Sequence, residues 1–169
     1  MADKFVIDAS VAAKWFLQDS FEDHVDLAEE VLLDLLAGEI ELHAPRIMSY
    51  EVCRLLWKAC LSKGPEKRAK RLDKETALEC VEAFFELSLP FADTTALEAA
   101  SAIEMGVRYW KNFYDMTYLH LAEELSCKII TADEKLLRSV PKGFPLQRFV
   151  LLTRYREERG KSNAPSARS

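Results

Sequence analysis

Short apolar runs alternate with longer amphipathic segments along the first half of the chain. The run at residues 4–7 (KFVI) lacks polar alternation, which is typical of a short strand buried on both faces. Residues 22–37 repeat apolar positions at three- and four-residue spacing, which predicts a helix. Residues 39–43 predict a second short strand, and Pro45 suits the first turn of a helix that we expect to reach about Leu61.

The second half of the chain continues the same alternation. Asp73 is a plausible N-cap for a helix that ends near Leu87, and Thr94 or Thr95 suits the start of the next helix. The apolar and β-branched pattern then predicts a helix, a strand, a short helix and a final strand, at residues 114–125, 128–131, 133–140 and 149–152.

Short strands without polar alternation, separated by longer helices, indicate a mostly parallel sheet that helices cover on both faces. We therefore expect an α/β fold, a three-layer α/β/α sandwich. The length of 169 residues suits one domain, which we place at residues 1–153. Residues 154–169 are basic and end in GKSNAPSARS, so we expect a disordered C-terminal tail.

Composition narrows the function classes. Apolar residues make up 49% of the chain, and the net charge of −5 (23 basic and 28 acidic residues) disfavours a generally basic protein that coats nucleic acid. No apolar run reaches the ~18–20 residues that span a membrane, and the N-terminus MADKFVIDAS lacks a signal-peptide pattern. We therefore expect a cytoplasmic protein without membrane partners. The four cysteines form no CxxC pair, which disfavours a zinc knuckle.

Four acidic residues occupy positions where a catalytic or ligand-binding side chain is expected. Asp8 directly follows the first strand, and Asp133 follows the strand at 128–131, so both belong to the carboxyl edge of a parallel sheet, where ligands bind. Asp115 lies at the start of a helix, and Glu51 lies inside a helix among apolar neighbours. Each acid also has a structural interpretation, as a helix cap, a helix-dipole partner or a solvated helix residue.

The order of these segments resembles a known family. VIDAS at 6–10, Pro45 with Glu51, YDMTY at 114–118 and ITADEKL at 130–136 follow one another as in the PIN-domain ribonucleases. The chain is most similar to the VapC toxins of prokaryotic toxin–antitoxin pairs, and the resemblance covers about residues 4–152.

This resemblance implies a metal-dependent endoribonuclease that uses Mg²⁺ or Mn²⁺. Asp8, Glu51, Asp115 and Asp133 match the acidic positions of the family, with Asp8, Asp115 and Asp133 as metal ligands and Glu51 as the residue that positions or deprotonates a water. Ser10 and Thr131 match hydroxyl positions beside those acids. Crowded carboxylates suit a cation, because two of them at ~4 Å repel by roughly 4 kcal/mol at an effective dielectric of 20.

The resemblance also implies partners: an RNA substrate, a small antitoxin protein and a second copy of the chain in a homodimer. The helices at 22–37 and 46–61 are the candidate homodimer faces. The basic run KGPEKRAKRLDK at 63–74 is either a solvated linker or a grip for the RNA backbone, through Lys67, Arg68, Lys70 and Arg71. Two alternatives stay open: a PIN-fold nuclease in RNA processing, and a non-catalytic binding module with the same fold.

Overall fold

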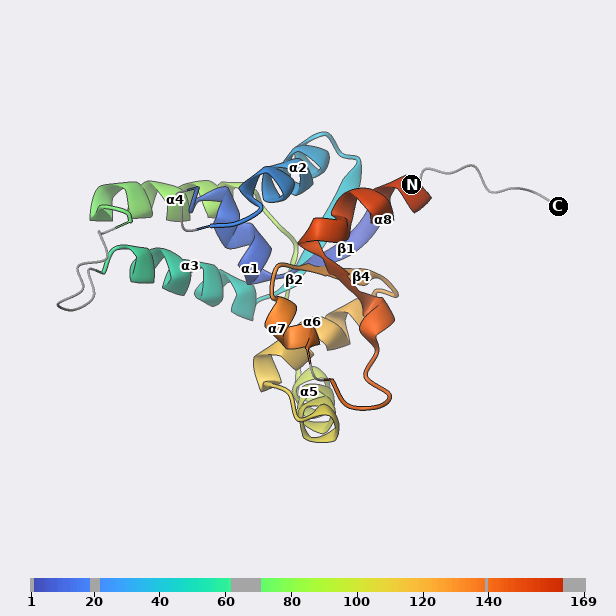
Figure 1. The fold of residues 1–169 in the computed structure, drawn as a ribbon. Helices are drawn as coiled ribbons and strands as arrows, with labels where there is room; N and C mark the ends of the chain where they lie inside the picture. The colour runs from blue at the N-terminus through green and yellow to red at the C-terminus, as the bar shows by residue number, and fades with distance from the viewer. Residues whose placement is uncertain (1, 19–21, 62–70, 139, 163–169) are drawn as a thin grey trace.

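A single sheet of five parallel strands forms the centre of the protein (Figure 1). This computed structural model describes residues 2–18, 22–61, 71–138 and 140–162. The strands lie in the order β3-β2-β1-β4-β5 and every neighbouring pair is parallel, which confirms the predicted sheet. Their bounds are β1 Asp3–Ile7, β2 Ile40–Pro45, β3 Phe91–Ala92, β4 Lys128–Thr131 and β5 Phe149–Leu151.

Helices cover both faces of the sheet, so the predicted α/β/α sandwich is confirmed. Helices α2 and α8 lie over one face, α5 and α6 lie over the other, and α3 and α4 extend side by side away from the sheet (Figure 1). The α-helices are α1 Ala9–Ala12, α2 Val25–Leu36, α3 Ile47–Ala59, α4 Lys74–Glu86, α5 Ala96–Tyr109, α6 Phe113–Glu124, α7 Glu134–Leu137 and α8 Tyr155–Ser162. The short 3₁₀ helices are η1 Ala13–Trp15, η2 Leu146–Arg148 and η3 Leu152–Arg154.

The strands without polar alternation form the centre of the hydrophobic core. Val6 and Ile7 of β1 and Ile130 of β4 are 0% exposed, because helices pack on both sides of these central strands. Met116 and Leu119 of α6 are equally buried. This packing fixes α6 across the middle of the sheet, next to the carboxyl ends of β1 and β4.

Several helices begin at the capping residues that the sequence predicts. Asp73 accepts a hydrogen bond from the Thr76 backbone N–H at 2.7 Å and caps α4. Thr95 and Glu98 form a reciprocal capping box at the start of α5. Pro45 differs from the prediction, because it is the last residue of β2 and α3 begins at Ile47. The missing N–H of the proline leaves no backbone bond to β3 unmade, because the next residue donates it. The backbone N–H of Arg46 bonds to the Ala92 carbonyl at 2.9 Å.

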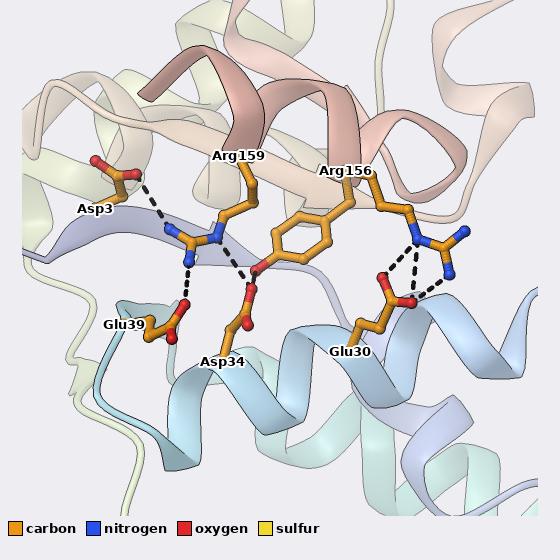
Figure 2. Close-up of polar contacts among 7 residues, drawn as sticks. Asp3, Glu30, Asp34, Glu39, Arg156 and Arg159 are labelled. Atoms are coloured by element: carbon orange, nitrogen blue, oxygen red, sulfur yellow. Dashed lines mark hydrogen bonds and ion pairs between the residues drawn. The ribbon is translucent and has the colours of Figure 1, made fainter. Parts of the chain in front are cut away.

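The structure of the C-terminal segment differs from the predicted disordered tail. Residues 155–162 form helix α8, so the expectation of disorder is wrong for them, whereas residues 163–169 lie outside the described residues. Tyr155 is 1% exposed and donates a hydrogen bond to Asp34 at 2.5 Å. Arg159 donates to the carboxylates of Asp34, Glu39 and Asp3, and Arg156 pairs with Glu30 on α2 (Figure 2). These partners are 120 or more residues away in the chain, so local sequence gives no sign of them.

We expect Arg159→Met to lower the free energy of unfolding by about 2–3 kcal/mol, because three carboxylates lose a shared cation that is 12% exposed. Urea denaturation followed by circular dichroism measures the change. Arg154→Met is the matched control, since Arg154 is exposed. Equal stability of the two variants would show that the Arg159 contacts contribute nothing.

Candidate active site

Asp8 is held at the carboxyl end of β1 by two hydroxyl groups. Its Oδ2 atom accepts hydrogen bonds from Thr131 Oγ1 at 2.5 Å and from Ser10 Oγ at 2.8 Å, and its Oδ1 accepts from the Ser10 backbone N–H at 3.4 Å. Thr131 is the last residue of β4, the strand beside β1, and is 0% exposed. Asp8 is also the N-cap of α1. It therefore acts as a helix cap, as its structural interpretation predicts, and is also a candidate site residue.

Asp133 caps a second helix at the same edge of the sheet. Its Oδ1 atom accepts hydrogen bonds from the backbone N–H groups of Lys135 at 2.8 Å and Leu136 at 3.2 Å. Its own backbone N–H donates to Thr131 Oγ1 at 3.1 Å. Thr131 therefore links the backbone at Asp133 to the carboxylate of Asp8, and the cap fixes the orientation of the Asp133 side chain.

Glu51 of α3 and Asp115 of α6 complete a cluster with these two acids. Burial raises the pKa of Asp115 to about 6, and the negative charges of Asp8, Asp133 and Glu51 add to the rise, while Lys111 opposes it. Burial likewise raises the pKa of Asp8 and that of Glu51, and the charge of Asp8 contributes at Glu51. The mutual charge effects indicate that the four predicted acids lie near one another, although among the described residues no three of them place ligand atoms within 4.8 Å of one another.

A groove of about 720 Å³ opens beside the cluster. Ser10 and Asp133 lie on its wall, and α3 contributes Leu55 and Lys58. On the same wall, Lys14 pairs with Glu22 at 2.8 Å, and Arg71 pairs with the other oxygen of the same carboxylate at 2.9 Å. Asp23 and Glu134 also line the groove, so its wall carries both signs of charge.

The basic residues predicted to bind RNA are only partly described. Arg71 lies in the groove wall, where it pairs with Glu22. Lys67, Arg68 and Lys70 lie outside the described residues.

Two features escaped the sequence analysis. The Tyr118 hydroxyl donates a hydrogen bond to Glu51 Oε2 at 2.5 Å, and its place in the YDMTY segment was the signal in the sequence. A separate group, Glu98, His120 and Glu124, places potential metal-ligand atoms within 4.8 Å of one another. The four-residue spacing of His120 and Glu124 on one helix was its signal, but Glu98 already serves the capping box of α5.

Comparison with known proteins agrees with this fold. The family model for the PIN domain matches residues 5–142, so the chain belongs to the PIN domain family. Among characterised proteins it is similar to Ribonuclease VapC3 of Pyrobaculum aerophilum, with 24% identity over 139 residues that cover 82% of this chain and 95% of the relative.

Two solved structures share the fold. The crystal structure of PAE2754 from Pyrobaculum aerophilum has a TM-score of 0.59 at 17% identity and covers 95% of this chain and 98% of its own. The structure of Mycobacterium tuberculosis VapC20, described as a toxin that cleaves the sarcin–ricin loop, has a TM-score of 0.54 at 14% identity, over 81% of this chain and 99% of its own. Within the described ranges, every helix is too short or too polar to cross a lipid bilayer.

Proposed function

We propose that the protein is a metal-dependent endoribonuclease that acts as the toxin of a VapBC-type pair. The convergence of Asp8, Glu51, Asp115 and Asp133 at the carboxyl edge of the sheet carries this conclusion. Membership of the PIN domain family and the similarity to Ribonuclease VapC3 support it.

The acidic cluster suits a divalent cation with oxygen ligands. Its donor atoms are carboxylate oxygens, which Mg²⁺ and Mn²⁺ prefer. Burial raises the pKa of Asp115, and the charges of Asp8, Asp133 and Glu51 add to the rise, so a cation bound among these carboxylates would relieve part of this cost. Asp8, Asp115 and Asp133 would hold the ion, which when bound activates a water and stabilises charge on the phosphate.

The side chains of the site have distinct tasks in this function. Ser10 and Thr131 donate hydrogen bonds to Asp8 and keep its carboxylate in one orientation. The N–H groups at the start of α7 do the same for Asp133. Glu51 positions the attacking water and accepts its proton, and the raised pKa of its half-buried carboxyl makes it a stronger base than an exposed glutamate.

RNA is the substrate in this proposal, and its phosphates need cations near the acids. The groove supplies Lys58, while Lys14 and Arg71 on its wall share the carboxylate of Glu22. Contacts from Lys67, Arg68 and Lys70 stay predictions, as does a location in the cytoplasm.

The antitoxin and the homodimer also stay predictions. The two helices expected to form the homodimer correspond to α2 and α3, which expose Leu33 and Leu36, and Tyr50 and Trp57, respectively. Apolar exposure is also pronounced where α5 meets α6, since Trp110 there is 92% exposed.

RNA cleavage in defined metal solutions tests the function. We expect the wild-type protein to cut structured RNAs with Mn²⁺ or Mg²⁺, to lose this activity in EDTA and to regain it when Mn²⁺ is added back. Growth arrest on expression, relieved by a co-expressed antitoxin, would distinguish a toxin from an RNA-processing nuclease. Cleavage that persists in EDTA would exclude the proposed chemistry, and no cleavage under any condition would favour the non-catalytic module.

A further inference from the structure

Tyr118 lies buried beneath the acidic cluster, and its hydroxyl contacts one of the four acids directly. The residue is 4% exposed, and its hydroxyl donates to Glu51 Oε2 at 2.5 Å. Tyr118 belongs to α6 and Glu51 to α3, 67 residues apart in the chain. The bond therefore joins the helix that crosses the sheet to a helix that extends away from it (Figure 1).

Tyr118 is more buried than Glu51. Its helix neighbour Leu119 is fully buried, and the backbone N–H of Ala9 faces the phenol oxygen. Burial, with the charges of Asp8 and Glu51, keeps the pKa of Tyr118 well above its usual value, so the hydroxyl keeps its proton and acts as a donor. Glu51 is a flexible side chain that is only half-buried, so without this bond its carboxylate would sample several rotamers.

We propose that Tyr118 is a positioning residue for RNA hydrolysis, whose hydroxyl holds the Glu51 carboxylate in one orientation toward Asp8 and Asp115. Glu51 can assist a water only from a fixed position, because misplacement of a catalytic group by about 1 Å can cost about 10²-fold in rate. The role assigned to Tyr118 rests on the proposed nuclease function. It predicts that the hydroxyl matters through Glu51 and through no other group.

The test compares Tyr118→Phe with Tyr114→Phe, which removes the same atom from an exposed tyrosine on the same helix. With a short fluorogenic RNA and saturating Mn²⁺, we expect Tyr118→Phe to lower kcat about 10- to 100-fold, the range for a hydrogen bond to a charged group, with KM within about twofold. Tyr114→Phe should stay within about twofold of wild type in both constants. In a Glu51→Gln background, the further change Tyr118→Phe should lower kcat by less than about twofold, because the group that it positions has lost its function.

The controls separate this role from the nuclease function itself. Wild-type cleavage is measured first, and its absence defeats the nuclease function before Tyr118 is tested. If the wild type cleaves, an unchanged kcat in Tyr118→Phe overturns the positioning role and leaves the function standing. A loss that persists in full in the Glu51→Gln background, or a melting temperature of Tyr118→Phe below the assay temperature, assigns the residue to folding and also overturns it.

Discussion

Asp8→Asn lowers metal-dependent RNA cleavage by at least about 10³-fold, the largest loss that we expect from a single substitution. The Asp8 carboxylate accepts hydrogen bonds from the hydroxyls of Ser10 and Thr131, and Asp8 caps α1. Replacing one carboxylate oxygen by an amide removes a negative charge and a ligand from the cluster. Single-turnover cleavage of a labelled RNA at saturating Mn²⁺ measures the change.

The fold should survive this substitution, because asparagine caps a helix about as well as aspartate does. The far-ultraviolet circular dichroism of Asp8→Asn should therefore match that of wild type. Asp26→Asn is the matched control, since Asp26 lies in the first turn of α2 with a side chain that is 73% exposed. Cleavage by Asp8→Asn within tenfold of wild type would remove Asp8 from the proposed metal site.

Asp115→Asn is expected to stabilise the metal-free protein at pH 7.5 by about 1–3 kcal/mol, or roughly 3–8 °C in melting temperature. The pKa of Asp115 is raised from 3.8 to about 6 in the folded state. The folded protein therefore loses stability as the pH rises from below 3.8 to above 6, and the whole penalty is present at pH 7.5. Asparagine carries no charge and removes this penalty, whereas below pH 3.8 the two proteins should melt alike.

The same substitution should weaken the response of the melting temperature to metal. Millimolar Mn²⁺ should raise the melting temperature of wild type, because an ion that binds only the folded state stabilises it. Asp115→Asn should respond much less, and Asp26→Asn should respond as wild type does. Scanning fluorimetry with and without EDTA measures both effects. A melting temperature of Asp115→Asn that is lower than that of wild type without metal would contradict the crowding of charge at this site.

The sequence predicts the strands and the positions of the acids because both depend on local signals. The unalternating run at β1 is typical of a strand buried on both faces of a parallel sheet, and an acid directly after such a strand lies at its carboxyl edge. The four acids were identified because they match the acidic positions of the PIN-domain family, and the structure places them near one another. Their roles as metal ligands and base stay proposals.

Contacts between distant side chains could not be predicted in this way. The bond from Tyr118 to Glu51 depends on how α3 and α6 pack, which apolar spacing alone leaves undetermined. Helix α8 has few apolar residues, so its sequence resembles a solvated tail. Its order comes from Tyr155 and from two arginines that find carboxylates on β1, α2 and the turn before β2.

The strand order also determines when the site can form during synthesis. β1 lies between β2 and β4, and Asp8 takes a hydrogen bond from Thr131, which the ribosome adds 123 residues later. A nascent chain that has not reached β4 lacks both this hydroxyl and Asp133. The proposed nuclease centre is therefore incomplete until most of the chain has been translated.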